Sequence, residues 1–128
     1  SVNRKIDILT KEIQGEVAFL IHPGQRVMIP TGLIFDIPED HVIEMFIRSS
    51  AATKKGLQLV NGVGIIDSDY VDETHILVHN ISDSLTRIQH GERLAQCRLA
   101  KVNQITLVKS NEKPVQKTDR TGGIGSTD

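Results

Sequence analysis

The chain has 128 residues, of which 38% are hydrophobic and 3% aromatic, so its core must be built mainly from Ile, Leu and Val. This length suits one domain whose core is large enough to need no disulfide or metal support. The formal net charge is −1, from 15 basic and 16 acidic residues. This balance argues against nucleic acid as a main partner, because proteins that bind its phosphate backbone carry a basic excess.

Short apolar segments separated by turn residues make up most of the chain. Turn signals such as Pro23-Gly24, Thr31-Gly32 and Asn61-Gly62 separate these segments. Many short segments at this spacing are typical of an all-β sandwich or barrel. We expect strands over residues 17–22, 26–30, 33–37, 41–48, 57–60, 74–80, 85–89 and 104–109.

Two segments could form a helix. Residues 93–102 are good helix formers, but the alternation of Ala95, Cys97 and Leu99 fits a strand equally well. Residues 50–55 predict one short helix. Its initial Ser is suited to cap the N-terminus, and Gly56 can take the left-handed conformation that ends a helix.

The C-terminal residues differ in composition from the rest of the chain. From Ser110 onward the only clearly apolar residues are Val115 and Ile124, which are too few to order the segment by burial. We therefore predict a β-barrel domain over residues 1–109 and a mobile C-terminal arm over residues 110–128.

The remaining general features point to the cytoplasm. Cys97 is the one cysteine, so no internal disulfide can form, which suits a reducing compartment. No apolar run approaches the ~20 residues that span a membrane, and the first residues lack the apolar stretch of a secretory signal. Because the sequence starts at Ser1 and not at Met, we also expect a processed or shortened N-terminus.

The triplet Arg48-Ser49-Ser50 precedes and begins the predicted helix. Backbone N–H groups and the helix dipole favour an anion at such a position, and a guanidinium and hydroxyls add donors for phosphate. The alternative interpretation is a helix cap beside a surface Arg.

Residues 61–70 contain two glycines, a strand-like pair of Ile residues, and then Asp67 and Tyr70. The glycines permit a tight turn and close approach of a ligand to the backbone. Asp67 could activate a water molecule or bind a hard cation. Alternatively, Asp67 and Asp69 form hydrogen bonds within a hairpin turn.

Residues 120–127 combine an Arg with a Gly-rich, hydroxyl-bearing segment that could wrap a polyphosphate. They do not form a Walker A loop, because no Lys precedes the Ser and no helix follows. The alternative is a disordered tail. The five histidines form no recognisable metal-binding signature.

Taken together and in this order, these segments resemble the trimeric dUTP pyrophosphatase (dUTPase) family from about Asp7 to the end of the chain. The shortened tail is similar to that of the Gram-positive bacterial and phage branch. The resemblance implies a jelly-roll-like β-barrel, a homotrimer with active sites shared between subunits, and Mg²⁺-assisted hydrolysis of dUTP to dUMP and pyrophosphate. The matching stretches are Pro30-Thr31-Gly32-Leu33, Arg48-Ser49-Ser50, Gly64-Ile65-Ile66-Asp67-Ser68-Asp69-Tyr70, Gly91-Glu92-Arg93-Leu94-Ala95-Gln96 and residues 120–127.

The resemblance also implies a role for each matching residue. Asp67 would be the base that activates water for in-line attack on the α-phosphorus, and Tyr70 would pack against the deoxyribose. Asn61, with the hairpin backbone at Gly64 and Ile66, would read the uracil edge. Asp7 would hold waters on Mg²⁺. Ile124 would cover the base. The remaining residues would bind the triphosphate, those after residue 119 from a neighbouring subunit: Arg48, Ser49, Ser50, Gln96, Arg120, Gly122, Gly123 and Ser126.

Three departures from the family pattern leave other functions open. The Asp7 segment lacks the usual preceding Ala-Gly, Val71-Asp72 replaces Arg-Gly, and Ile124 stands where most members carry a Phe that stacks on uracil. A catalytically weakened scaffold that binds nucleotides as a regulatory module is therefore one alternative. The related dCTP deaminases are another, but the Glu they require is absent near Leu77.

Overall fold

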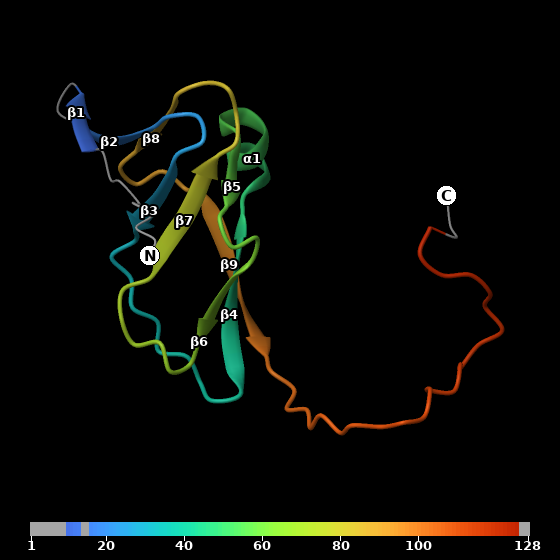
Figure 1. Cartoon of the computed structure of the whole chain (residues 1–128). Helices are drawn as coiled ribbons and strands as arrows, with labels where there is room; N and C mark the ends of the chain where they lie inside the picture. Colours follow the sequence, from blue (N-terminus) through green and yellow to red (C-terminus); the bar gives the residue numbers. More distant parts are fainter. Residues whose placement is uncertain (1–9, 14–15, 126–128) are drawn as a thin grey trace.

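The computed structural model describes residues 10–13 and 16–125 of the chain. Within these ranges the chain forms strands joined by short turns, with a single short helix (Figure 1). The elements are β1 (Thr10–Ile13), β2 (Glu16–Ile21), β3 (Arg26–Pro30), β4 (His41–Ile47), α1 (Ser49–Lys55), β5 (Leu57–Leu59), β6 (Gly64–Asp67), β7 (His75–Asn80), β8 (Thr86–Gln89) and β9 (Ala95–Lys101).

Three small sheets make up the β-barrel, with strand orders β1-β2-β8, β3-β7-β5 and β6-β4-β9. All the pairings are antiparallel. The second and third sheets are built from strands that are far apart in the sequence, such as β3 with β7 and β4 with β9. This arrangement confirms the all-β, jelly-roll-like fold with one short helix.

Strand pairing decides the ambiguous segment and corrects two expectations. The segment that fitted both a helix and a strand is a strand, because β9 pairs along the whole of β4, from His41 opposite Lys101 to Ile47 opposite Ala95. Residues 33–37 and 104–109 are not strands, and those two predictions are wrong. Among the described strands none pairs with residues 33–37, and of these five residues Ile37 alone is buried in the core.

The core lies between the inner faces of the sheets and is almost entirely aliphatic, as the composition predicted. Phe19 and Phe35 only pack against its edge. The buried hydrophobic residues among those described are Ile21, Val27, Ile29, Ile37, Met45, Ala51, Leu57, Leu59, Ile66, Val78, Ile88 and Leu94.

The helix α1 differs from its prediction at the N-terminus. Its N-cap is Arg48 in an extended conformation, without a side-chain hydrogen bond, and Ser49 is already helical. The predicted Ser cap is therefore wrong, because Arg48, directly after β4, occupies the cap position and both serines already belong to the helix. The predicted end is correct: Gly56 takes a left-handed φ of 65°, and its N–H donates to the Ala51 carbonyl.

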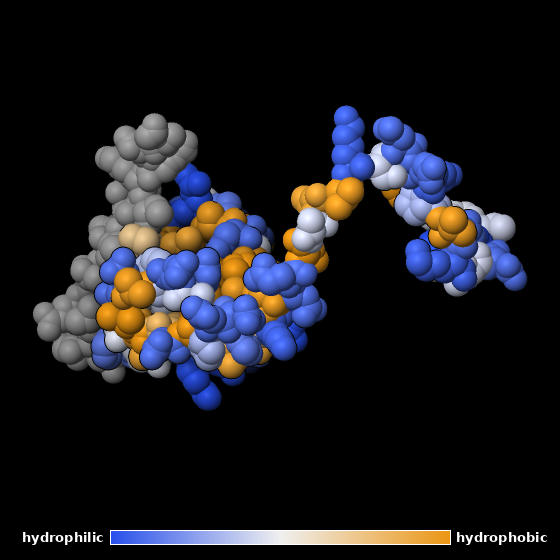
Figure 2. Space-filling model, turned by 90° about the horizontal axis from the view of Figure 1, so that it is seen from below, coloured by the Kyte–Doolittle hydropathy of each residue, from blue (hydrophilic) through white to orange (hydrophobic). Residues whose placement is uncertain are grey.

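After β9 the chain leaves the barrel as an extended, exposed segment without helix or strand up to residue 125 (Figure 1). Figure 2 shows this segment projecting from the body, with hydrophobic side chains close to its point of departure. These include Ile105, Leu107 and Val108, whose exposed fractions are 78%, 89% and 81%. Residues 104–109 thus expose apolar side chains and pair with no strand in the part of the chain that the structure describes, which is why the strand prediction failed there.

Candidate active site

A first pocket is built by the tight turn between β5 and β6. The Gly62 N–H donates to the Leu59 carbonyl at 3.1 Å, and Gly62 has a φ of 75°, which favours glycine. β6 then runs so close to β4 that a Cβ on Gly64 would lie 3.1 Å from the Met45 Cβ. The two glycines thus let the chain turn sharply and bring β6 against β4.

This pocket has a volume of about 350 Å³ and contains five of the residues that the sequence singled out: Asn61, Gly64, Ile66, Asp67 and Tyr70. Its volume lies within the range of small-molecule sites. Because β6 is at the edge of its sheet, one side of its backbone carries N–H and C=O groups that no strand pairs. The pocket therefore combines a carboxylate, an aromatic ring and an open backbone edge.

Other lining residues come from distant strands and were not anticipated. Met28 on β3 lies opposite Leu77 on β7, and both line the pocket with Met45, giving it an apolar wall. Thr74 and His75 complete the lining. No local pattern marked these residues, because their shared position depends on the pairing of β3 with β7 and on the packing of β4.

Asp67 and Tyr70 are held by the turn that follows β6. Asp67 is the last residue of β6 and is exposed, and its carbonyl accepts a hydrogen bond from the Tyr70 N–H at 3.0 Å. The Tyr70 hydroxyl donates to the Glu73 carbonyl at 2.7 Å. The ring is 41% exposed, so a fixed aromatic surface stands beside an accessible carboxylate.

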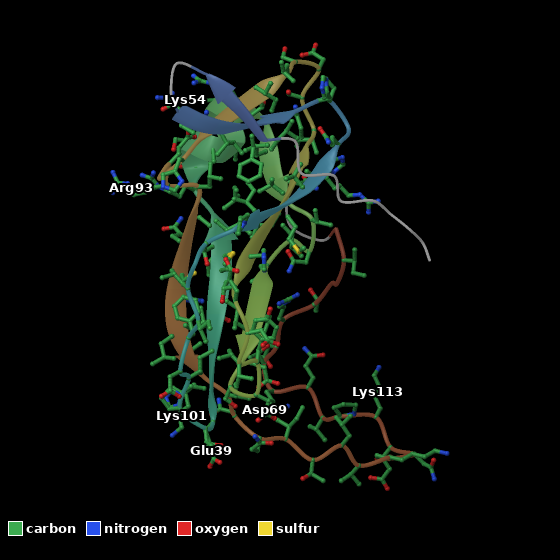
Figure 3. The ribbon with its side chains drawn as sticks, turned by 90° about the vertical axis from the view of Figure 1, so that its left-hand side faces the viewer. Glu39, Lys54, Asp69, Arg93, Lys101 and Lys113 are labelled. Atoms are coloured by element: carbon green, nitrogen blue, oxygen red, sulfur yellow. The ribbon has the colours of Figure 1, made fainter. Side chains whose placement is uncertain are left out.

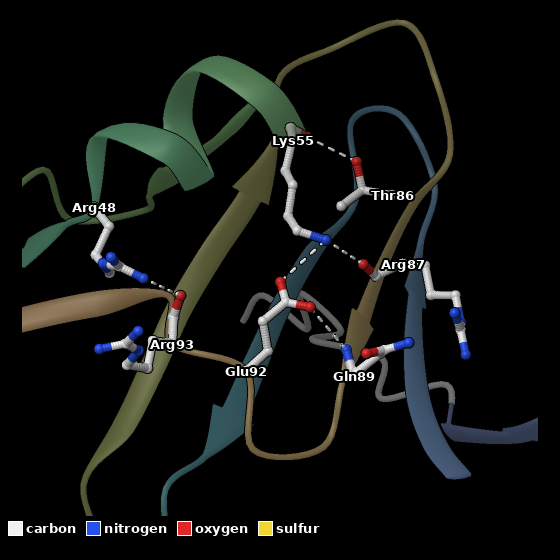
Figure 4. Close-up of polar contacts among 7 residues, drawn as sticks. All are labelled: Arg48, Lys55, Thr86, Arg87, Gln89, Glu92 and Arg93. Carbon is white, nitrogen blue, oxygen red and sulfur yellow. Dashed lines mark hydrogen bonds and ion pairs between the residues drawn. The ribbon is translucent and has the colours of Figure 1, made fainter. Parts of the chain in front are cut away.

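A second pocket, of about 480 Å³, lies between α1 and the loop before β9. Its lining includes the cationic residues Arg48, Lys54, Lys55 and Arg93 and one carboxylate, Glu92. Lys55 Nζ forms an ion pair with Glu92 Oε2 at 3.0 Å (Figure 4). The four cationic side chains and the one acidic side chain leave an excess of three positive charges, so the pocket attracts anions.

Hydrogen bonds fix the shape of the second pocket (Figure 4). Lys55 Nζ also donates to the Arg87 carbonyl at 2.7 Å, and the Gln89 N–H donates to Glu92 Oε1 at 3.2 Å. Arg48 Nη1 donates to the Arg93 carbonyl at 3.3 Å. The loop before β9 is therefore tied to both ends of α1.

The other predicted residues lie in several places. Arg48 and Ser50 line the second pocket, whereas Ser49 is exposed at the start of α1. Gln96 is exposed on β9, opposite Phe46 of β4. The exposed arm carries Arg120, Gly122, Gly123 and Ile124. Asp7 and Ser126 lie outside the described residues.

The two pockets lie at different ends of β4. Asp67 pairs with Val42 near the start of β4, whereas Arg48 follows its last residue. At about 3.3 Å per extended residue, the six steps from Val42 to Arg48 separate the two sites by about 20 Å. In Figure 3, Lys54 and Arg93 of the second pocket lie toward one end of the barrel, and Asp69, two residues after Asp67, lies toward the other. One chain therefore does not bring Asp67 and Arg48 together.

Other kinds of site find little support in the part of the chain that the structure describes. It contains no group of three or more His, Cys, Asp or Glu residues placed to hold a metal ion. Partial burial raises the pKa of the Cys97 thiol, which keeps it protonated and argues against a catalytic thiolate. Among the same residues, no helix is long and apolar enough to cross a membrane.

Comparison with known proteins finds one family throughout. The dUTPase family model matches residues 12–128. The deoxyuridine 5'-triphosphate nucleotidohydrolase of Chlamydia muridarum is 37% identical over 107 residues, which are 84% of this chain and 74% of that protein. The crystal structure of the dUTPase from Streptococcus mutans superposes with a TM-score of 0.66 and 28% identity, covering 82% of this chain and 95% of that chain.

A third comparison concerns a phage protein. A mutant dUTPase from phage phi11 of S. aureus, described with a structural Mg(II) ion, has a TM-score of 0.65 and 22% identity to this chain. The match covers 88% of this chain and 89% of that chain. At 22% sequence identity, this comparison shows that the two proteins share a fold.

Proposed function

Since this chain belongs to the dUTPase family and is a hydrolase of the dUTP diphosphatase class, we propose that it cleaves dUTP to dUMP and pyrophosphate through water activated by Asp67. The observation that carries this proposal is the first pocket. It joins an accessible carboxylate, a fixed tyrosine ring and an open strand edge in a space of nucleoside size. Each of these three features suits one part of a deoxyuridine nucleotide.

The base would be recognised by the open edge of β6. Uracil presents acceptor, donor and acceptor groups in a row, and the unpaired backbone groups between Gly64 and Asp67 can complement such a row. The Asn61 side chain adds an amide at the turn. Cytosine has the reversed pattern at two of these positions and would leave buried polar groups unpaired, which is strongly rejected.

The sugar would pack on Tyr70. Its hydroxyl is engaged by the Glu73 carbonyl, so the ring presents its face and not its polar end. A deoxyribose fits against such a face, whereas a ribose 2′-hydroxyl would crowd it. The α-phosphorus would then lie near Asp67, which takes a proton from the attacking water.

The triphosphate would be bound by residues from other subunits. Asp67 and Arg48 lie about 20 Å apart in one chain, too far to act on one nucleotide. We therefore propose a homotrimer in which the second pocket of a neighbouring subunit, with Arg48 and Ser50, faces the first pocket, and in which the exposed Ser49 and Gln96 of that neighbour also contact the phosphates. Exposed apolar residues such as Ile105 and Leu107 favour burial of the arm against a neighbour. Such docking would deliver residues 120–126 to a shared site.

The residues described here fit a magnesium ion that arrives with the substrate. They form no metal-binding cluster, and Mg²⁺ in such sites is held largely by substrate phosphates and water. When bound, Mg²⁺ offsets charge on the triphosphate as pyrophosphate leaves. Asp7 is proposed to hold waters on the ion and lies outside the described residues.

Pyrophosphate release from dUTP, dCTP, dTTP and UTP tests the proposal. We expect a strong preference for dUTP and a loss of about 10²–10⁴-fold in kcat for Asp67→Asn, since this is the usual contribution of a general base. Asp69→Asn is the matched control, because it removes an exposed carboxylate from the same turn. Equal rates with all four nucleotides, or full activity of Asp67→Asn, would refute it.

A catalytically weakened, nucleotide-binding scaffold is the second candidate. It is favoured by Ile124, which brings no aromatic ring to a bound base. Tight binding of dUTP, together with no release of pyrophosphate, would support it. A deaminase is disfavoured, because the wall of the first pocket at Leu77 carries no carboxylate.

We also place the enzyme in the cytoplasm. The single Cys97 would remain a free thiol there, and a reducing compartment suits a chain without a cysteine pair. Alkylation of Cys97 in intact cells, after lysis and in the purified protein would compare the redox state of this thiol in the three samples.

A further inference from the structure

The segment at Glu73 and Thr74 joins the first pocket to the loop that follows β3. The Gly32 N–H donates to Glu73 Oε2 at 2.8 Å, and Thr31 Oγ1 donates to the Thr74 carbonyl at 2.6 Å. The Thr74 N–H in turn donates to the Leu33 carbonyl at 2.8 Å. Residues 31–33 therefore hold residues 73–74 through both backbone and side-chain contacts.

The same segment anchors Tyr70. The phenol hydroxyl is bonded to the backbone carbonyl of Glu73, not to a side chain. The direction of the ring therefore depends on where the backbone of residue 73 is held. On the β7 side, His75 Nδ1 lies 3.1 Å from the same Glu73 carbonyl. On the other side, where Val71 and Asp72 are exposed, the Glu73 carboxylate bonded to Gly32 ties this turn to the loop after β3.

We propose that Glu73 is a positioning residue that fixes the ring of Tyr70 and thereby sets the selectivity for deoxyribose over ribose nucleotides. Its carboxylate acts through Gly32 and its own backbone, without touching substrate. An ionised acceptor suits this position because charge-assisted hydrogen bonds are about twice as strong as neutral ones. Asp67, Asp69 and Asp72 already make this turn acidic, and a further negative charge disfavours an anionic substrate. The strength of the hydrogen bond to Gly32 is the reason why a carboxylate is nevertheless present at residue 73.

This inference rests on the proposed function, and its kinetic test compares dUTP with UTP. In Glu73→Ala the KM for dUTP should rise about tenfold and the preference for dUTP over UTP should fall about tenfold, with kcat within about twofold of the wild type. Glu73→Gln keeps an oxygen acceptor for the Gly32 N–H and should restore most of the preference. Asp72→Asn removes a charge from the same turn without removing that hydrogen bond, and should leave the preference unchanged.

A second readout needs no activity. Tyr70 is the only Tyr and the chain has no Trp, so intrinsic fluorescence reports on this ring alone. Acrylamide quenching of Tyr70 should be about twofold more efficient in Glu73→Ala than in the wild type, and unchanged in Glu73→Gln and Asp72→Asn. If the wild type does not hydrolyse dUTP, the proposed function fails, and the quenching still tests the role of Glu73.

The outcomes separate a positioning role from a purely structural one. If Glu73→Ala lowers the melting temperature but leaves both the nucleotide preference and the quenching at wild-type values, the inference is wrong. If Glu73→Ala does not fold, Glu73→Asp carries the test, because its carboxylate is one methylene too short to reach Gly32. Glu73→Asp should then behave as described for Glu73→Ala, and wild-type preference and quenching in Glu73→Asp would overturn the inference.

Discussion

Complementation between two inactive variants tests the shared active site most directly. Arg48→Ala removes a guanidinium from the second pocket, and Asp67→Asn removes the carboxylate from the first. Loss of a charged hydrogen-bond donor typically costs about 1.5–3 kcal/mol, which is about 10–150-fold in rate. Loss of the base costs about 10²–10⁴-fold. Arg48→Ala alone should therefore keep about 1–10% of the activity, and Asp67→Asn alone about 1% or less.

Mixed trimers of the two variants should recover activity. With about 20 Å between Asp67 and Arg48 in one chain, each complete site takes the two residues from different subunits. In a random one-to-one mixture, about half of the first pockets retain Asp67, and about half of the neighbouring second pockets retain Arg48. In a closed homotrimer this gives about one quarter of wild-type sites. If both residues instead came from one chain, no mixed trimer would contain a complete site.

The assay is pyrophosphate release after the two variants are unfolded together and refolded. Differently tagged subunits, recovered through both tags, verify that exchange has occurred. The double variant Arg48→Ala/Asp67→Asn, mixed with wild type, provides the control for dilution of active subunits. Verified exchange without recovery of activity, or a native mass that corresponds to a monomer, would refute the shared site.

Three further predictions concern single residues. Asn80 is fully buried and its amide donates to the Ile21 and Ser84 carbonyls, so Asn80→Ala should lower the free energy of unfolding by about 3 kcal/mol in urea denaturation; a change below about 1 kcal/mol would contradict this. Thr74 Oγ1 is buried without a hydrogen-bond partner among the described residues, so Thr74→Val should be neutral or stabilise the fold by up to about 1 kcal/mol, as measured by the same method. Ile124→Phe should lower the KM for dUTP about five- to tenfold by adding a ring that stacks on the base, with Val115→Phe in the same arm as the control, and an unchanged KM would show that residue 124 does not reach the base.

Local signals in the sequence were sufficient for much of the fold. The strand over residues 26–30 has the predicted bounds, and the helix ends at Gly56 as predicted. Turn residues and apolar runs act over a few positions, so they are readable without knowledge of the whole chain. The same signals failed at residues 33–37 and 104–109, because an apolar run becomes a strand only where another strand can pair with it.

The candidate site likewise has a part that local sequence signals predicted and a part that depends on tertiary packing. Asn61, Gly64, Ile66, Asp67 and Tyr70 are close together because they lie within ten consecutive residues, and their shared pocket needed only a tight turn. The apolar wall at Met28 and Met45 and the link from Glu73 to Gly32 were not foreseeable, since they depend on how distant strands pack.

The sequence by itself determined the family, the strand-rich architecture and the residue types of the chemistry, since motifs and turns are local and keep their order along the chain. Tertiary structure alone decided that Ala95–Lys101 is a strand. It also decided that Arg48 lies at the opposite end of β4 from Val42, with which Asp67 pairs. Such distances follow from strand pairing over the whole barrel, which no short stretch of residues encodes.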